Sequence, residues 1–296
     1  MHCIGRFVQP RTGHRLHNEP MVKVSVVILT WNSVPEVGRC LASLPNGLTF
    51  PHEVIVIDNG SQDQTVSTIT HQFPQVQLVK NDRNCGVAPA RNQGLRLARG
   101  EYVLILDDDT IIHPTALDRL VRFLDARPDV GLCGPKLIDA DGQLCLSCRL
   151  FPTVLDKLGR RFPSTLTWQA ARKAELADWA HDTTRSVDYV IGACQMIRRT
   201  ALSEVGLLDE NIFYGPEDID LCLRMYEAGW RVVYHPQASV THAERRVARS
   251  ALSRLGWKHV GGLIYYFWKH KYLFSRQKLY ARFPKSCKSC HMSEAL

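Results

Sequence analysis

Three consecutive carboxylates, Asp107-Asp108-Asp109, follow the apolar run Tyr102-Val-Leu-Ile-Leu106. Five apolar residues bounded by polar ones are typical of a strand buried on both faces of an α/β sheet. Ligands bind such sheets at the carboxyl ends of the strands, where these aspartates lie. Adjacent carboxylates repel one another, whereas a hard divalent ion such as Mg²⁺ or Mn²⁺ accepts oxygen ligands and can be shared with phosphates. The segment therefore indicates a metal ion that holds a diphosphate, with a solvated acidic turn as the alternative.

A second acidic cluster follows Pro216, where Glu217, Asp218 and Asp220 occupy the first turn of an expected helix. Acids in a first turn are favoured by the helix dipole, so a purely structural role is the alternative. Neighbouring helical residues point about 100° apart, so only one of Glu217 and Asp218 can face a given ligand. Asp220 and Arg224 are spaced i, i+4, and we expect them to pair with each other.

Alternating strands and helices must position both clusters. Apolar runs predict buried strands at 24–29, 53–57, 76–79 and 130–133. Helices are predicted at 33–44, after Asp63 to about Gln72, at 87–98 and at 113–126. Residues 136–186 are expected to form loops and a polar, helix-like stretch that contains Trp168 and Trp179. Such a long irregular insertion is more often functional than idle. Short elements are then expected at 187–192, 194–197, 200–205, 232–234 and 238–241. The fold class is therefore α/β, with a mainly parallel central sheet flanked by helices.

The composition is that of an ordinary globular protein, with 45% hydrophobic and 22% charged residues among 296. No apolar run reaches the roughly 18 residues needed to cross a bilayer, and residues 1–20 lack a hydrophobic signal core. We therefore expect a cytoplasmic protein whose first 20 residues form a disordered leader.

Positive charge is concentrated near the carboxyl end. Twelve Lys or Arg and no Asp or Glu lie between Arg245 and Lys288, so removing them from the net charge of +8 leaves the rest of the chain at −4. Aromatic residues are interleaved with these cations, which predicts that the basic helical extension 244–296 binds anionic membrane surfaces. The alternative is a solvated helical face packed on the domain. Nucleic-acid binding is not expected, because the rest of the chain is acidic.

Six segments, in this order, resemble the motifs of family 2 glycosyltransferases. They are Val24-Ser-Val-Val-Ile-Leu-Thr-Trp-Asn32, Val56-Ile-Asp-Asn-Gly-Ser-Gln-Asp63, Asn84-Cys-Gly-Val-Ala-Pro-Ala-Arg-Asn-Gln-Gly94, Leu106-Asp-Asp-Asp-Thr110, Ile191-Gly-Ala-Cys-Gln-Met-Ile-Arg-Arg199 and Tyr214-Gly-Pro-Glu-Asp-Ile-Asp-Leu-Cys-Leu-Arg224. Arg149-Leu-Phe-Pro-Thr153 and the run Glu217 to Arg224 resemble most the bacterial rhamnosyltransferase group.

The resemblance implies a GT-A fold over residues 21–243, with a nucleotide-binding half at 21–135 and an acceptor-binding half at 136–243. It also implies roles for individual residues. On the donor side, Thr30 and Asn32 line the nucleotide pocket, Asp58 binds the pyrimidine base and Arg91 lies near the phosphates. At the metal site, Asp109 is the metal ligand, Asp107 approaches the ribose or metal, and His242 completes the metal or diphosphate site. On the acceptor side, Asp218 is the catalytic base, and Gly192, Ala193 and Glu217 face the acceptor. Many relatives carry Asn-Pro-Asp where this chain has three aspartates, which keeps the carboxylate at 109 but leaves the role of Asp107 open.

The implied activity is an inverting glycosyl transfer that depends on Mg²⁺ or Mn²⁺. The donor is a nucleotide diphosphate sugar, with dTDP-rhamnose the best match, and the acceptor is a glycan or lipid-linked hydroxyl in cell-surface polysaccharide synthesis at the inner face of the cell membrane. Two alternatives stay open: a catalytically silent protein that binds sugar nucleotides, and a nucleotidyltransferase, which would release pyrophosphate.

Overall fold

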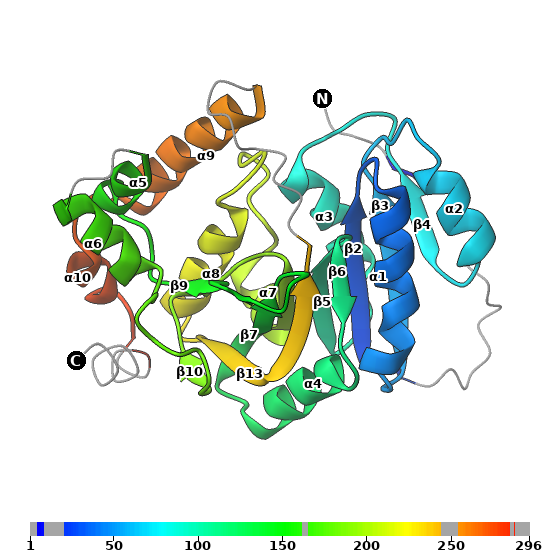
Figure 1. Ribbon diagram of the computed structural model, residues 1–296, viewed down its shortest axis with the longest axis horizontal. Helices are drawn as coiled ribbons and strands as arrows, with labels where there is room; N and C mark the ends of the chain where they lie inside the picture. Colours follow the sequence, from blue (N-terminus) through cyan, green and yellow to red (C-terminus); the bar gives the residue numbers. More distant parts are fainter. Residues whose placement is uncertain (1–4, 9–20, 162–164, 244–253, 285–286, 288–296) are drawn as a thin grey trace.

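The computed structural model describes residues 5–8, 21–161, 165–243, 254–284 and 287 (Figure 1). Within them an 11-stranded sheet has the order β1-β4-β3-β2-β5-β12-β7-β13-β10, with β6 beside β13 and β8 beside β7. The strands are β1 (Arg6–Phe7), β2 (Val24–Thr30), β3 (His52–Asp58), β4 (Gln77–Lys80), β5 (Tyr102–Asp107), β6 (Thr110–Ile112), β7 (Val130–Ile138), β8 (Leu144–Cys145), β10 (Arg185–Ser186), β12 (Cys194–Arg198) and β13 (Arg231–His242). A second sheet pairs β9 (Cys148–Arg149) with β11 (Tyr189–Val190).

The register of the parallel strands brings the predicted site residues to one edge. Strand β2 lies between β3 and β5 and is parallel to both. Thr30 pairs with Asp58, and Leu29 pairs with Asp107. The carboxyl ends of the three strands therefore meet, as the parallel α/β prediction required.

Helices cover both faces of the main sheet. Helices α1 (Val34–Gly47), α2 (Thr65–Gln72) and α4 (Ala116–Ala126) bury their apolar residues in one core, and α3 (Val87–Leu97), α7 (Arg199–Val205) and α8 (Glu217–Glu227) contribute to cores on the other face. Helices α5 (Val154–Arg161), α6 (Thr165–Ala174), α9 (Arg254–His270) and α10 (Arg276–Tyr280) gather at the left end in Figure 1. Among the described residues no helix is long and apolar enough to span a bilayer.

Three local expectations were wrong. Arg6 and Phe7, assigned to a disordered leader, form β1 and pair antiparallel with β4, because backbone pairing at a sheet edge needs no apolar periodicity. The other leader residues, 1–4 and 9–20, lie outside the described part of the chain. Within 136–186, the helix-like stretch expected at Trp168 is α6, but Trp179 lies beyond its end and α5 was not expected. The two brief strands expected at 232–234 and 238–241 are one strand, β13, with an irregular register between His235 and Ser239.

The described part of the carboxyl-terminal segment is built into the fold. Tyr266, Phe267, Leu279 and Phe283 are buried in the same core as the inner face of α8. Residues 254–284 therefore pack as part of the same body as the preceding domain. Five of the twelve cations counted in this segment, including Arg245, lie outside the described residues.

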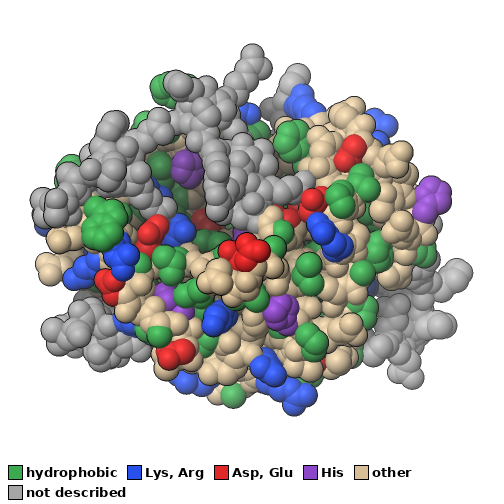
Figure 2. Space-filling view, in the orientation of Figure 1, with side chains coloured by type: hydrophobic (Ala, Val, Ile, Leu, Met, Phe, Trp, Pro, Cys, Tyr) green, Lys and Arg blue, Asp and Glu red, His purple; other side chains and the backbone are tan. Residues whose placement is uncertain are grey.

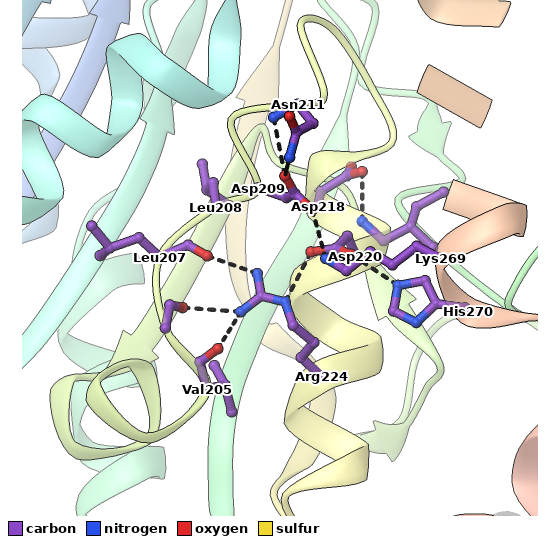
Figure 3. Close-up of polar contacts among 12 residues, drawn as sticks. Val205, Leu207, Leu208, Asp209, Asn211, Asp218, Asp220, Arg224, Lys269 and His270 are labelled. Atoms are coloured by element: carbon purple, nitrogen blue, oxygen red, sulfur yellow. Dashed lines mark hydrogen bonds and ion pairs between the residues drawn. The ribbon is translucent and has the colours of Figure 1, made fainter. Parts of the chain in front are cut away.

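A buried carboxylate joins α9 to α8 (Figure 3). Asp220 on α8 has no solvent exposure and accepts hydrogen bonds from Arg224 Nε at 2.8 Å, Lys269 Nζ at 2.6 Å and His270 Nε2 at 2.8 Å. The expected pairing of Asp220 with Arg224 is confirmed. Arg224 also donates to the carbonyl groups of residues 205–207, so one cluster fixes α8 to both the end of α7 and the end of α9.

Candidate active site

Two carboxylates and an imidazole converge where β5 and β13 end. One ligand atom from each of Asp107, Asp109 and His242 lies within 4.8 Å of the others. His242 Nε2 is 3.2 Å from Asp109 Oδ1 and 3.8 Å from Asp107 Oδ2. The pairing of His242 with Thr110 across β13 and β6 sets this approach. Figure 2 shows histidine, acidic and basic side chains around a hollow near the centre of the same face as in Figure 1.

The donor set of this cluster fits a divalent metal ion. Burial raises the pKa of Asp107, the neighbouring Asp109 adds to the effect, and Arg91 and His242 oppose it. A cation between the carboxylates would remove their repulsion, and carboxylate oxygens with one imidazole nitrogen suit Mn²⁺ or Mg²⁺. The predicted ligands Asp109 and His242 are therefore adjacent, and Asp107 is the third candidate ligand.

Arg91 on α3 links this cluster to the first turn of α8. Its Nη2 donates to Asp107 Oδ1 at 2.5 Å and to the Gly192 carbonyl at 3.0 Å, and its Nη1 lies 3.4 Å from Glu217 Oε1. A Cβ atom at Gly192 would stand only 2.7 Å from Arg91 Nη1. Any larger residue at position 192 would therefore push the guanidinium group out of this position.

The two neighbouring acids of α8 point to different partners, as the helical geometry predicted. Asp218 Oδ2 accepts a hydrogen bond from the Gly192 backbone N–H at 3.0 Å, and Asp218 Oδ1 accepts one from the Ile219 N–H at 2.8 Å. Glu217 is buried against Arg91. Burial raises the pKa of Glu217 to about 7, with a further rise from Asp218 and an opposing effect of Arg91. Asp218 is thus the more accessible of the two carboxylates.

Most of the predicted residues line one cavity of about 320 Å³. They are Arg91, Asp107, Gly192, Ala193, Glu217, Asp218 and His242. The cavity therefore joins a candidate metal site at the sheet edge to a carboxylate on α8, and its walls come from both halves of the chain. A small polar ligand can contact both groups at once.

Asp109 does not line the cavity but contacts His242, which does. The other predicted residues outside that lining lie at the ends of β2 and β3. Asp58 is buried and both of its carboxylate oxygens accept from the Ser61 N–H at 3.3 Å. Burial raises the pKa of Asp58, and the bonds from Ser61 oppose the rise. Asn32 has φ 49° and its Oδ1 accepts from the Gln62 N–H at 2.8 Å. Thr30 pairs with Asp58 across β2 and β3, so Thr30, Asn32 and Asp58 lie together where these two strands end.

Several cavity-lining residues escaped the sequence analysis. They are Arg149, Lys157, Tyr189, Tyr214 and His259. Arg149 and Tyr214 belonged to segments already singled out, without an assigned role for either residue. Lys157 and His259 lie on α5 and α9, and no sequence signal gives the position of either helix relative to the sheet.

The comparisons with known proteins cover most of the chain. Residues 25–206 match the profile of the family described as "Glycosyl transferase family 2". The N-acetylglucosaminyl-diphospho-decaprenol L-rhamnosyltransferase of Mycobacterium tuberculosis is 30% identical over 262 residues, which are 83% of this chain and 84% of that protein. The pre-mycofactocin glycosyltransferase of the same organism is 32% identical over 235 residues, 78% of this chain and 45% of that protein.

Two solved structures share the fold. A mannosyltransferase from Pyrobaculum calidifontis, in complex with GDP-Man and Mn²⁺, has a TM-score of 0.60 at 22% identity and covers 92% of this chain and 69% of its own. GalNAc-T7 with UDP, GalNAc and Mn²⁺ has a TM-score of 0.63 at 16% identity, covering 93% of this chain and 55% of its own. The expected GT-A fold is confirmed.

Proposed function

Because the chain belongs to glycosyl transferase family 2, we propose that it transfers a sugar from a nucleotide diphosphate donor to an acceptor hydroxyl, with inversion at the anomeric carbon. The observation that carries this proposal is that one cavity is lined both by Asp107 and His242 of the candidate metal site and by Asp218 of α8. A protein that only binds sugar nucleotides has no need of the second carboxylate. A nucleotidyltransferase would release pyrophosphate instead of a nucleoside diphosphate.

Each site residue predicted from the sequence has a role in this proposal. Asp107, Asp109 and His242 would hold Mg²⁺ or Mn²⁺, which supplies a Lewis acid for the donor diphosphate. Arg91 adds positive charge next to that diphosphate, and Glu217 orients Arg91. Thr30, Asn32 and Asp58 receive the nucleoside at the neighbouring strand ends, and Gly192 and Ala193 border the acceptor.

Asp218 is the proposed general base. Two backbone N–H groups hold its carboxylate in place, one on each oxygen. The acceptor hydroxyl attacks the anomeric carbon from the side opposite the leaving diphosphate, and Asp218 accepts the hydroxyl proton as the new bond forms. The donor bond breaks in the same displacement, so no covalent enzyme intermediate is required.

We propose dTDP-rhamnose as the donor and a lipid-linked sugar as the acceptor. The mycobacterial relative is a rhamnosyltransferase whose name gives N-acetylglucosaminyl-diphospho-decaprenol as its substrate. The segment Arg149 to Thr153 supports the same group by resemblance. Such a reaction belongs to cell-surface polysaccharide synthesis.

The test incubates the full chain with Mn²⁺, a panel of nucleotide sugars and N-acetylglucosaminyl diphosphate carrying a short prenyl chain. We expect rhamnose transfer from dTDP-rhamnose with release of dTDP. Faster transfer from a UDP-sugar would overturn the donor assignment. Release of pyrophosphate would show that the protein is a nucleotidyltransferase instead of a glycosyltransferase. Donor binding without turnover would favour a catalytically silent protein that binds sugar nucleotides.

We also propose peripheral binding to the inner face of the membrane through α9. Trp257, Ile264 and Trp268, which are 65%, 65% and 73% exposed, lie on one face of the helix with Val260, at i, i+7, i+11 and i+3. Beside them an apolar groove of about 690 Å³ is lined by residues of α9 and α10 and by the cations of residues 271, 278 and 282. Apolar and cationic side chains together suit the surface of an anionic bilayer.

Co-sedimentation with vesicles of anionic phospholipid tests this surface. Ile264→Ser with Trp268→Ser should weaken binding strongly, and raised salt should weaken it further. Trp168→Ser is the matched control, because Trp168 is an exposed tryptophan on α6 that does not line the groove. Absence of binding by the wild-type chain at low salt, or equal losses in test and control variants, would contradict the proposal.

A further inference from the structure

The cavity has a second group of nitrogen-containing side chains that the proposed chemistry does not use. Arg91 serves the donor side, where it contacts Asp107. Arg149, Lys157 and His259 line the same cavity but come from β9, α5 and α9. None of these three elements belongs to the nucleotide-binding half. Arg91 and the metal ligands already provide the contacts for the donor diphosphate. Arg149, Lys157 and His259 are therefore available to bind a second anion.

The segment Arg149 to Thr153 is folded so that Arg149 reaches the cavity. Phe151 anchors the segment: it is fully buried in an aromatic cluster and its N–H donates to Asp188 Oδ2 at 2.5 Å. Arg149 Nε donates to the Leu146 carbonyl at 3.2 Å, which orients the guanidinium group. Burial opposes the charge of Arg149, but Tyr189, Glu175 and Asp218 outweigh it and raise the pKa of Arg149. The cation therefore lies within electrostatic reach of the proposed base.

The same segment starts the helix that carries Lys157. Thr153 Oγ1 accepts from the Asp156 N–H at 3.3 Å, and the Thr153 N–H donates to Asp156 Oδ2 at 2.6 Å. This reciprocal pair begins α5 and puts Lys157 in its first turn. Lys157 therefore lies four residues after Thr153, whose contacts with Asp156 fix the start of α5.

His259 closes this wall from α9. Its ring lies 6.0 Å from the Tyr214 ring, and Nδ1 would be 3.1 Å from a Cβ atom at Gly215. Nδ1 is buried and has no hydrogen-bond partner among the described residues. Burial lowers the pKa of His259 and the charge of Lys157 adds to the effect, while the backbone of Tyr214 and Gly215 and the charge of Asp218 oppose it. A neutral imidazole has one N–H donor.

We propose that Arg149, Lys157 and His259 form an anion subsite that binds the diphosphate of a lipid-linked acceptor. The proposal rests on the proposed function, because it takes Asp218 as the group that meets the acceptor hydroxyl. One sugar ring separates that hydroxyl from the diphosphate, so the anion must bind near Asp218 and away from the donor phosphates. Two cationic side chains and one N–H donor match the charge and the acceptor oxygens of a diphosphate.

The test compares two acceptors with one donor. The full chain receives dTDP-rhamnose, Mn²⁺ and either prenyl diphosphate-linked N-acetylglucosamine or octyl N-acetylglucosaminide, which has no phosphate. Lys157→Gln should raise KM for the diphosphate acceptor about tenfold or more, since a charge-assisted contact is lost. KM for the octyl acceptor and KM for the donor should stay within about twofold.

Controls separate this effect from loss of structure. Lys173→Gln removes an exposed lysine of α6 that does not line the cavity, and it should leave all three KM values unchanged. Lys157→Glu should enlarge the effect of Lys157→Gln, and Arg149→Gln should act in the same direction. Thermal melting checks that each variant is folded.

The outcomes distinguish the two levels of the argument. No rhamnose transfer to either acceptor by the wild-type chain would mean that the proposed function has failed. Wild-type transfer with equal losses for both acceptors in Lys157→Gln would overturn the anion subsite alone. A rise confined to the donor KM would also overturn it, and would assign these cations to the donor diphosphate.

Discussion

Asp220→Asn removes one negative charge from the cluster that joins α8 to α9 (Figure 3). Asp220 is fully buried and accepts from Arg224, Lys269 and His270. Burial acts to raise the pKa of Asp220, but the bond from His270 and the charges of Arg224 and Lys269 outweigh it and lower the pKa below its ordinary value. Asparagine keeps the shape, but its amide is neutral, so Arg224 loses its carboxylate partner and Lys269 keeps only that of Asp209.

The magnitude follows from what Arg224 and Lys269 retain. Breaking a buried ion pair from one side costs about 3 to 5 kcal/mol. Here the cost is smaller: the Arg224 and Lys269 side chains are 16% and 26% exposed, Arg224 keeps its backbone carbonyl partners, and Lys269 keeps Asp209 at 2.7 Å. We expect a loss of about 2 to 3 kcal/mol in the free energy of unfolding, which is about 4 to 12 °C in Tm for a chain of this size.

Thermal unfolding followed by circular dichroism at pH 7 measures this loss. Asp178→Asn is the matched control, because Asp178 is 77% exposed in its pair with Arg172 and should cost under about 1 kcal/mol. A lowered folded pKa contributes stability that is present above the ordinary aspartate pKa and is lost as the pH falls. The difference in free energy of unfolding between wild type and Asp220→Asn should therefore begin to decrease below about pH 4.

The same variant also tests whether the cluster positions the proposed base. Asp218 lies two residues before Asp220 on α8, so a loosened helix should lower kcat while KM for the donor changes little. Equal Tm losses in Asp220→Asn and Asp178→Asn would refute the account of the buried cluster. An unchanged kcat in a clearly destabilised Asp220→Asn would separate stability from positioning.

Three further outcomes are expected. Asp109→Asn should abolish Mn²⁺-dependent binding of the donor nucleotide in calorimetry, and an unchanged affinity would move the metal site elsewhere. Asp218→Asn should lower the rate of sugar transfer by roughly 10² to 10⁴ with donor binding kept; a near wild-type rate there, with a large loss in Glu217→Gln, would transfer the role of base to Glu217. The pKa of Glu217 is raised to about 7, so its contribution to stability is full below its ordinary pKa and declines as the pH rises through about 7. Urea unfolding should therefore show that the free energy of unfolding of Glu217→Gln rises relative to that of wild type between pH 5 and pH 8. If the two free energies change in parallel with pH, the raised pKa of Glu217 is contradicted.

The sequence predicted those parts of the site that follow from strand periodicity. The apolar runs of β2, β3 and β5 gave their positions to within about two residues, and the parallel arrangement then required Thr30, Asp58 and Asp107 to meet at one edge. Register, which the hydrophobic pattern sets, is the physical reason for this success.

Contacts between distant elements could not be predicted in this way. The partner of Asp220 four residues away was foreseen, but Lys269 and His270 are 49 and 50 positions away. Lys157 and His259 reach the cavity because α5 and α9 pack there, and amphipathic patterns say which face of a helix is buried without saying against what. The pairing of Arg6 with Lys80 is of the same kind, since it uses the backbone alone.

The contact between Arg91 and Asp107 makes the acidic cluster partly self-neutralising. A metal ion that enters alone must share Asp107 with a cation already bonded to it, so we expect the ion by itself to bind weakly and to exchange readily. A metal ion that arrives with a nucleotide diphosphate brings its own negative charge, and Arg91 can then turn from the carboxylate to the phosphate. Metal and nucleotide should therefore each strengthen the other's binding, and the loss of the nucleotide should free the ion as well.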